Sequence, residues 1–411
     1  MNKSMVKSRP GILMVANYSN QTGYAWNNIF RLFEQLAFES QKYGIAAWVS
    51  FERFEPPLTW EHAHIFEGVL ELPPLPKGVR ELLVWVRSIR AHGIRYLYLT
   101  DQPSRSFYYA VFRLAGIRAI IVHSRVSVAD PNPAIPERGF LGFMKWIACR
   151  IPFIQATRVY AVSDFVRNRL VVKAKLPSER VVTILNGVDL ERFAPCKTKD
   201  QSGYVRIFCG GRATVYKGIG VLIKAAALLR DKFGLTDFEV VYAGEGPDLP
   251  VFEELVQDLN LSERFKFLGE MPSTEAQVKN ADIVVFPSIW GDACPSAVSE
   301  ALAAGKPLVA TRVGGVPELV GEDGSAIMVE PGDIALLAEA VARLIENPRE
   351  RKALAERARQ RAEQALDQRR YYAEVRRQLI SDIGLPAFSK GGAASITLSG
   401  SEAKLHRNPR G

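Results

Sequence analysis

The sequence lacks a long apolar run, and no stretch approaches the roughly 20 residues that a membrane-spanning helix needs. Behind the basic start of the chain, residues 1–10, only residues 11–16 form an apolar run, which is too short for a signal peptide. We expect this run to form the first strand instead. With neither a spanning helix nor an export signal in view, the sequence predicts a cytoplasmic protein.

Cysteine is scarce, with four residues among 411, at positions 149, 196, 209 and 294. Their spacing matches no metal-ligand pattern and no disulfide framework, so free thiols are expected, with Cys294 near the active loop described below. An Asp-x-Asp motif at the end of a strand is also absent. These absences predict that the protein needs no metal and no other cofactor.

No nucleic-acid-binding motif accompanies the net charge of +9. The charge is concentrated between Arg80 and Arg180, where 17 basic and 6 acidic residues leave an excess of +11. This excess fits either an ordinary solvated surface or a face that is attracted to anionic lipid, and nucleic acid is not an expected partner. Within it lies the apolar segment Phe140–Ile154, which fits a buried helix and an interfacial membrane helix equally well.

Strand and helix signals alternate along a chain that is too long for one ordinary core. One set of alternating elements precedes the polar segment Pro195–Ser202, which is the expected domain boundary, and a second set follows it. The prediction is an α/β fold of two Rossmann-like domains, residues 1–198 and 199–383, whose parallel sheets face each other across a cleft. Residues 384–411 are rich in Gly, Ser and Ala and are predicted to be a disordered tail.

The most informative stretch is residues 281–320, which predict a strand, a loop, a helix and a second strand. Asp292 stands just before the helix and Glu300 stands inside it. The free N–H groups of the first helical turn, near Ser296 and Ala297, favour a bound anion. A phosphate at this position, with a carboxylate on either side to accept hydrogen bonds from hydroxyl groups, suits a sugar nucleotide.

This stretch resembles the Glu-x7-Glu region of retaining GT-B glycosyltransferases of family 4. Asp292 and Glu300 have the required spacing, and the sequences Ala-Leu-Ala-Ala-Gly-Lys-Pro and Gly-Gly-Val-Pro-Glu follow them. The chain departs from the family pattern in having Asp292 in place of the first Glu. The resemblance implies that Glu300 binds the ribose of the donor and Asp292 a hydroxyl of its sugar. The alternative is that both acids are ordinary surface residues.

Two further loops of the second half match the family. Arg212 and Lys217 flank a loop that opens with two glycines, and two cations in one loop can hold a diphosphate and stabilise its growing charge. Gly246 belongs to a Gly-Glu-Gly-Pro turn that lets the backbone approach a ligand closely. By resemblance, the two cations bind the donor diphosphate and the turn lies beside the base. A simple connecting turn and solvated surface cations are the alternatives.

The first half offers fewer matches. Gly23 opens the first helix and is expected near the donor phosphates, although the family often has two glycines there. His123 ends a strand at the edge of the cleft and, by resemblance, contacts the transferred sugar, with a purely structural role as the alternative. Asn186 and Asp189 match an Asn-Gly-Val-Asp turn that is expected at the domain junction. The proline-rich stretch Ser124–Arg138 is long for a connection and is expected to receive the acceptor.

Together these features and the family resemblance predict a metal-independent hexosyltransferase that acts in cell-surface polysaccharide synthesis, and the resemblance implies that the transfer is retaining. The donor would be a UDP- or GDP-sugar, and the acceptor a glycan or a lipid-linked glycan. An anionic membrane surface, on the inner face of the membrane, is a possible partner. The alternatives are a GT-B sugar phosphorylase or epimerase, and a non-catalytic, membrane-associated scaffold with the same fold.

Overall fold

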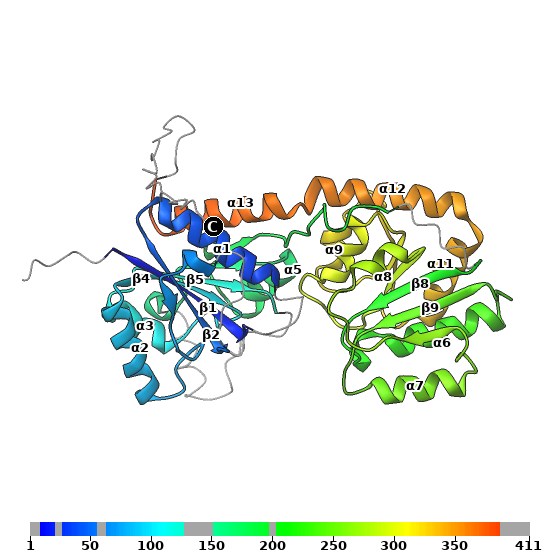
Figure 1. The fold of residues 1–411 in the computed structure, drawn as a ribbon, viewed down its shortest axis with the longest axis horizontal. Helices are drawn as coiled ribbons and strands as arrows, with labels where there is room; N and C mark the ends of the chain where they lie inside the picture. The colour runs from blue at the N-terminus through cyan, green and yellow to red at the C-terminus, as the bar shows by residue number, and fades with distance from the viewer. Residues whose placement is uncertain (1–8, 21–26, 56–62, 127–150, 197–202, 387–411) are drawn as a thin grey trace, which may run out of the picture.

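The computed structural model describes residues 9–20, 27–55, 63–126, 151–196 and 203–386. It contains two parallel α/β domains side by side (Figure 1). The N-terminal sheet has seven strands in the order β3-β2-β1-β4-β5-β6-β7, and the C-terminal sheet has six in the order β10-β9-β8-β11-β12-β13. The predicted fold, with two parallel-sheet domains, is confirmed.

The strands of the N-terminal sheet are β1 (Gly11–Ser19), β2 (Ala46–Arg53), β3 (Gly68–Val69), β4 (Ile94–Thr100), β5 (Ala119–Ser124), β6 (Arg158–Ala161) and β7 (Val181–Thr183). Helices α1 (Asn27–Lys42) and α13 (Gln368–Asp382) cover one face, and α2 (Val79–Ala91), α3 (Phe107–Ala115) and α5 (Asp164–Asn168) cover the other. The interior strand β1 is apolar and solvent-inaccessible from Ile12 to Ala16, as expected for a strand that is buried on both faces.

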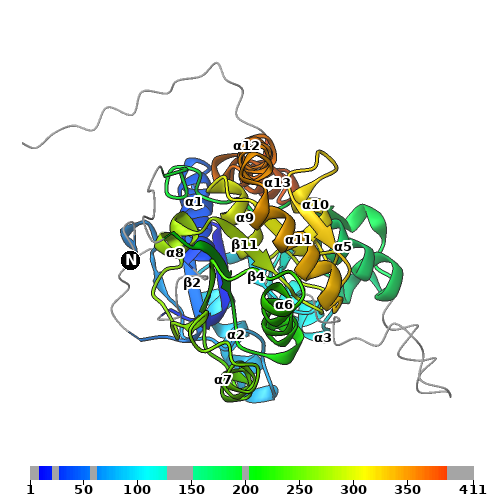
Figure 2. The same cartoon turned by 90° about the vertical axis from the view of Figure 1, so that its right-hand side faces the viewer.

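The C-terminal sheet consists of β8 (Val205–Gly210), β9 (Phe238–Ala243), β10 (Phe265–Phe267), β11 (Ile283–Phe286), β12 (Leu308–Thr311) and β13 (Ile327–Val329). One face packs against α6 (Ile219–Asp231), α7 (Leu249–Asp258) and α11 (Ile334–Glu346), of which α6 and α11 lie side by side in Figure 2. The other face packs against α8 (Glu275–Asn280), α9 (Ser296–Ala303), α10 (Val316–Val320) and α12 (Pro348–Ala365).

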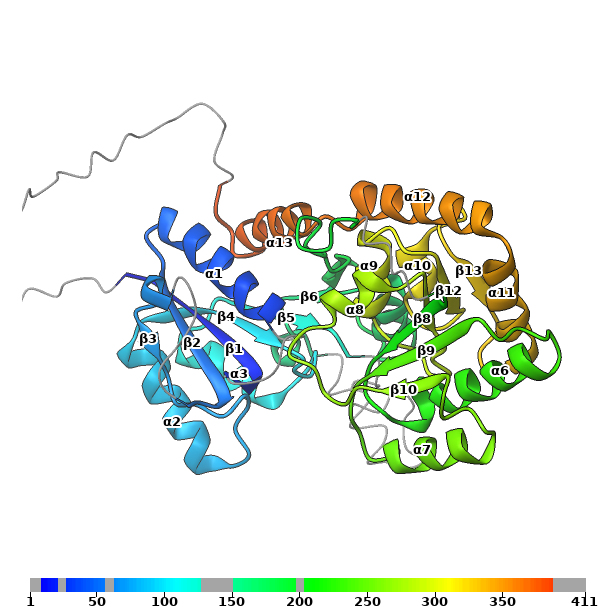
Figure 3. The same ribbon diagram turned by 45° about the vertical axis from the view of Figure 1, so that its right-hand side comes forward.

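The chain crosses between the domains twice, and the second crossing corrects the predicted domain limits. Helix α12 packs on the C-terminal sheet, but α13 returns to the N-terminal domain and lies beside α1 (Figure 3). Its side chains Tyr371, Val375 and Leu379 belong to the N-terminal core. The assignment of residues 199–383 to the C-terminal domain is therefore wrong for α13, because the apolar face of this helix is buried against the other sheet.

The two crossings are hydrogen-bonded to each other. The Val188 N–H donates to Leu366 O at 2.8 Å, and the Gln368 N–H donates to Val188 O at 3.1 Å. Gly187 is required at this contact, since a Cβ there would lie 2.4 Å from the Gln368 Cα. The junction between the domains is thus a pair of adjacent strands of chain rather than two independent linkers.

Several predictions concern residues that the structure does not describe. Gly23, most of Ser124–Arg138, residues 140–150 of the apolar segment and residues 387–411 of the tail lie outside the described residues. The described end of the apolar segment forms a short 3-10 helix, Pro152–Ile154, in which Ile154 is buried and Phe153 is exposed. Among the helices that the structure describes, none is both long and apolar enough to cross a membrane.

Candidate active site

The loops that carry the predicted donor residues pack against one another at the carboxyl edge of the C-terminal sheet. The Ala213 N–H donates to Glu245 O at 2.8 Å, and the Ile289 N–H donates to Tyr216 O at 2.9 Å. Gly246 fits only because it has no side chain, since a Cβ there would lie 2.3 Å from Ala213 O. The backbone therefore brings together three loops that are far apart in the sequence.

Lys217 and Asp292 form an ion pair between two of these loops. The Lys217 Nζ lies 2.5 Å from Asp292 Oδ1, and both side chains are largely buried. The backbone of Asp292 is held in turn by the Gly315 N–H, which donates to Asp292 O at 2.8 Å. Asp292 Oδ2 is buried and has no hydrogen-bond partner. One carboxylate oxygen thus neutralises the lysine, and the other remains available to accept a hydrogen bond.

Arg212, Ser296 and Ala297 border this pair on the chain. The Arg212 side chain is exposed and makes no ion pair or hydrogen bond among the residues that the structure describes. Ser296 and Ala297 are the first two residues of α9, and their side chains are exposed and partly exposed, respectively. Arg212 is therefore free to reach a ligand, whereas Lys217 already has a partner.

Glu300 lies in α9 but its described contact is with a different element. Its side chain is 7% exposed, and its Oε2 accepts a hydrogen bond from Thr274 Oγ1 at 3.1 Å. Burial raises the pKa of the Glu300 carboxyl to about 7, against the opposing effects of the Thr274 hydrogen bond and the charge of Arg192. The two acids of the motif are thus held in different ways, Asp292 by a cation and Glu300 by a neutral hydroxyl.

His123 is more deeply buried than the sequence analysis predicted when it placed this residue at the edge of the cleft. It is the penultimate residue of β5 and is 0% exposed. Its Nδ1 lies 2.6 Å from the Tyr98 hydroxyl, and its ring packs against those of Tyr160 and Tyr371. Burial lowers the pKa of the imidazole well below its ordinary value, so the ring is neutral, and its Nε2 has no partner.

Arg125 is a candidate site residue that the sequence analysis did not name. Its N–H donates to Asp101 Oδ1 at 2.6 Å, and its Nη2 donates to the Tyr371 hydroxyl at 2.7 Å. The second oxygen of Asp101 accepts a hydrogen bond from the Tyr18 hydroxyl, and Asp101 has a left-handed backbone with φ of 52°. Asp101 and Arg125 directly follow β4 and β5, and Tyr18 is the penultimate residue of β1. Their place at the carboxyl ends of strands was the available signal, because ligands of such sheets bind there.

Unpartnered polar atoms gather where the two domains meet. Among the described residues, four buried atoms without a hydrogen-bond partner belong to this region, namely His123 Nε2, Arg125 Nε, Asn186 Oδ1 and Asp292 Oδ2. Buried polar groups are nearly always satisfied in folded proteins, so such atoms indicate where a ligand or water binds. The expectation that Asn186 lies at the domain junction agrees with its hydrogen bond to Cys294, two residues after Asp292.

Cys294 lies beside this region as a buried thiol. Burial raises its pKa to about 11, while hydrogen bonds from Asn186 and the charge of Arg125 act in the opposite direction. The thiol therefore stays protonated at neutral pH. Among the residues that are described, no group of three or more His, Cys, Asp or Glu side chains is arranged to hold a metal ion.

The domains also contact each other beside the site. The Glu318 carboxylate, at α10 of the C-terminal domain, accepts hydrogen bonds from the N–H groups of Asp164 and Phe165 at 2.5 and 2.8 Å. A carboxylate at the N-terminus of a helix is favourably placed, because the free N–H groups of the first turn carry partial positive charge. This contact holds α5 against α10, and Gly315, just before α10, donates its N–H to Asp292 O.

Sequence comparison finds glycosyltransferases among the proteins that this chain resembles. An alpha-D-kanosaminyltransferase from Streptomyces kanamyceticus is 28% identical over 296 residues, which are 67% of this chain and 75% of that protein. The putative colanic acid biosynthesis glycosyltransferase WcaL of Escherichia coli is 31% identical, over 44% of this chain and 46% of its own. An MMP alpha-(1->4)-mannosyltransferase from Mycolicibacterium hassiacum is 32% identical over 54% of this chain and 53% of that protein. The chain thus spans about half the length of the latter two relatives.

Solved structures share the fold over nearly the whole chain. A glycosyltransferase from Rickettsia africae has a TM-score of 0.73 at 18% identity and covers 92% of this chain and 99% of its own. The Anabaena protein HepE, solved in complex with UDP, has a TM-score of 0.70 at 18% identity. The match covers 90% of this chain and 100% of the HepE chain. Residues 195–361 match the family model described as Glycosyl transferases group 1. The chain therefore has the GT-B fold and contains a glycosyl transferases group 1 domain.

Proposed function

We propose that this protein is a retaining glycosyltransferase that moves a hexose from a UDP- or GDP-sugar to a glycan or lipid-linked glycan. The observation that carries the proposal is the Lys217–Asp292 pair at the carboxyl edge of the glycosyl transferases group 1 domain. In this proposal the Lys217 cation binds a diphosphate, and the unpartnered oxygen of Asp292 accepts a hydrogen bond from a sugar hydroxyl.

The donor would lie along the three packed loops. Lys217 and the exposed Arg212 would bind the diphosphate, assisted by the N–H groups of Ser296 and Ala297 at the start of α9. Asp292 would accept a hydrogen bond from a hydroxyl of the sugar, and Glu300 would accept hydrogen bonds from the ribose hydroxyls. Gly246 would border the base. HepE structures in complex with UDP and with UDP-glucose support a uridine nucleotide as the first donor to try.

The reaction needs positioning and charge stabilisation more than covalent catalysis. The acceptor oxygen would attack the anomeric carbon on the face from which the diphosphate departs. As the bond to the diphosphate oxygen breaks, that oxygen would take the acceptor proton. Arg212 and Lys217 meet the negative charge that grows on the leaving diphosphate, which is why no metal is required in this proposal.

The N-terminal edge would receive the sugar and the acceptor. His123 is neutral and has a free Nε2, so it can exchange a hydrogen bond with a hydroxyl without adding charge. The nearby Nε of Arg125 is a second unused donor. The names of two relatives, which refer to colanic acid and amylovoran biosynthesis, favour an acceptor in cell-surface polysaccharide synthesis.

An anionic membrane is the proposed surface on which such an acceptor is met, on its cytoplasmic face. Exposed apolar side chains stand among arginines on the N-terminal domain, on α2 (Val79, Leu83), on α3 (Phe107, Leu114) and at Phe153. Basic residues near anionic lipid contribute about 1 kcal/mol each. Sedimentation with anionic and neutral vesicles tests this, and equal partitioning onto both, or onto neither, would contradict it.

The test of the proposed activity is donor turnover. UDP- and GDP-hexoses are first screened for thermal stabilisation, because a ligand that binds the native state raises its apparent stability. The best donor is then incubated with candidate glycan acceptors, and the products are analysed. A new glycoside together with released nucleoside diphosphate supports the transferase. An isomerised sugar nucleotide would indicate an epimerase, phosphate-dependent cleavage a phosphorylase, and binding without turnover a scaffold.

A further inference from the structure

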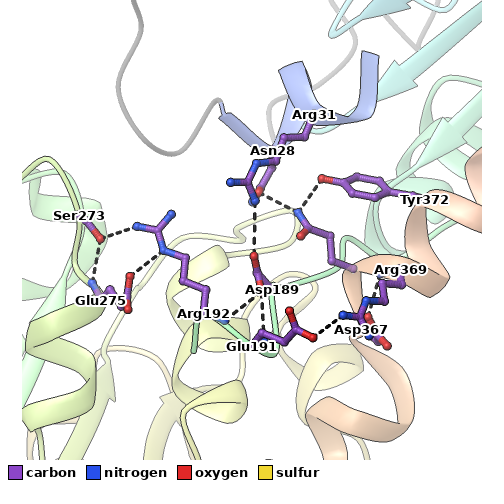
Figure 4. Close-up of polar contacts among 11 residues, drawn as sticks. Asn28, Arg31, Asp189, Glu191, Arg192, Ser273, Glu275, Asp367, Arg369 and Tyr372 are labelled. Carbon is purple, nitrogen blue, oxygen red and sulfur yellow. Dashed lines mark hydrogen bonds and ion pairs between the residues drawn. The ribbon is translucent and has the colours of Figure 1, made fainter. Parts of the chain in front are cut away.

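The first crossing between the domains carries an arginine that reaches into the donor domain. Arg192 lies four residues after Val188, and its Nε donates to Glu275 Oε2 at 2.8 Å while its Nη2 donates to Ser273 Oγ at 2.8 Å (Figure 4). The planar guanidinium thus binds the two residues on either side of Thr274. Two hydrogen bonds from one planar group fix both the position and the orientation of this segment.

The segment held by Arg192 is a tight turn in front of α8. The Glu275 N–H donates to Ser273 Oγ at 3.2 Å, so the turn is closed by its own atoms as well as by the arginine. Glu275 also pairs with Lys279 at 2.9 Å. The position of Thr274 is therefore determined from both sides.

Thr274 is the described hydrogen-bond donor to the Glu300 carboxylate. Its Oγ1 lies 3.1 Å from Glu300 Oε2, in a place where the glutamate is 7% exposed. A carboxylate that is shielded from water depends on such a donor for its orientation and its charge. The positive charge of Arg192 acts in the same sense on Glu300.

The other end of this chain of contacts reaches the N-terminal domain. Asp189 Oδ1 accepts from the Arg192 N–H at 2.9 Å, and its Oδ2 lies 3.4 Å from Arg31 Nη1 on α1 (Figure 4). Gln368, on the second crossing, donates to Asn28 Oδ1 at 3.1 Å. The arginine that holds the Thr274 turn is thus itself part of the junction.

We propose that Arg192 is a positioning residue for the nucleotide donor. By holding Ser273 and Glu275, it keeps the Thr274 hydroxyl against Glu300 and so orients that carboxylate toward the ribose hydroxyls. The affinity for the nucleotide then depends on the junction between the domains, although Arg192 itself does not touch the ligand. This proposal rests on the ribose-binding role proposed for Glu300.

The test measures the binding of UDP and of GDP by isothermal titration to the full-length protein and to Arg192→Gln and Thr274→Val. Each substitution is expected to lower the affinity for the tighter-binding nucleotide on the order of tenfold, as for the loss of a hydrogen bond to a charged group. The matched control is Arg206→Gln. Arg206 pairs with Glu239 at 2.7 Å, and its side chain is 25% exposed against 26% for Arg192. This control should bind the nucleotide normally.

A double-mutant cycle separates positioning from general loss of structure. If Arg192 acts through Glu300, Arg192→Gln should add less than about twofold to the effect of Glu300→Gln, because contacting networks are not additive. Full additivity would overturn the inference. Normal nucleotide affinity of Arg192→Gln alongside weak binding by Glu300→Gln would also overturn it. If Glu300→Gln itself binds normally, the ribose role fails first, and this outcome is distinct from the other two.

The pH dependence of nucleotide binding distinguishes positioning from a general loss of structure. Nucleotide binding should strengthen as the pH rises through the pKa of Glu300, since the ionised carboxylate is the better acceptor. Removing the charge of Arg192 takes away an influence that lowers this pKa. The profile of Arg192→Gln should therefore shift to higher pH relative to wild type, and an unshifted profile would contradict the proposal. Phosphate ionisation of the nucleotide is the same for both proteins and cancels in the comparison.

Discussion

The carboxyl edges of the two sheets both carry charge, but they organise it differently. At the C-terminal edge, charged side chains stand on loops that backbone contacts hold together, and Arg212 is exposed. At the N-terminal edge, His123 is buried, Asp101 is tied to Tyr18 of β1, and Arg125 is tied to Tyr371 of α13. The difference suggests that the first edge is ready to take an anionic ligand, whereas the second is a preassembled polar network.

The origins of the two edges differ in the same way. The C-terminal edge is built from short segments that are recognisable one at a time, such as residues 210–218 and 292–300. The N-terminal edge depends on Tyr371, which reaches it from α13 after the chain has crossed the molecule twice. A local motif therefore predicts the first edge, and only packing reveals the second.

The largest expected effect is at the C-terminal edge. Lys217→Ala and Arg212→Ala should each reduce donor turnover on the order of a hundredfold or more, because each cation meets charge that grows in the transition state. Steady-state kinetics with the identified donor provide the measurement. Lys266→Ala is the control, since Lys266 pairs with Glu239 at 2.8 Å away from these loops. Near-normal turnover of a folded Lys217→Ala variant would refute the diphosphate role.

The next effect concerns the polar network of the N-terminal edge. Arg125→Met should lower the free energy of unfolding by about 1–3 kcal/mol, because Tyr371 loses its donor and the Asp101 carboxylate loses its nearby cation. Urea denaturation measures the change. Arg118→Met, at an exposed position, should change the stability by less than about 0.5 kcal/mol. Equal stability of the two variants would show that the network is not structurally important.

The next effect is the pH dependence of stability that follows from the raised pKa of Glu300. The native pKa of Glu300, about 7, lies above that of an exposed glutamate, so the folded protein holds a proton that the unfolded chain has lost. Stability should therefore decrease as the pH rises from about 4.5 to 7, by up to about 1.4 kcal/mol per pH unit from this group. Glu300→Gln should remove that part of the slope. Superimposable stability profiles of the two proteins would contradict the raised pKa.

The smallest expected effect is that of a chelator. Turnover should be unchanged by EDTA, because Arg212, Lys217 and helix N–H groups supply the positive field that a metal would otherwise provide. The measurement is the rate before and after dialysis against the chelator, with a metal-dependent glycosyltransferase as the control. Inhibition that is reversed by added magnesium or manganese would count against the proposed mechanism.

Much of the fold and of the C-terminal edge could be predicted from sequence, for specific reasons. The continuous apolar runs at residues 12–16 and 283–286 indicate parallel strands buried on both faces. The helix 296–303 is preceded by a proline and followed by a glycine, which mark its ends. Such signals depend on neighbouring residues alone, so they can be interpreted without knowledge of the tertiary structure.

The sequence by itself determined the two α/β sets, the glycine turns, and the identity and spacing of Asp292 and Glu300. Only the tertiary structure decided that Asp292 pairs with Lys217, that Glu300 is held by Thr274, and that α13 returns to the N-terminal core. Arg192 and Arg125 acquire their partners in the same way, from residues about 80 and 250 positions away. The physical reason is that propensity and hydrophobic period are local along the chain, whereas burial and charge pairing depend on which distant segments meet.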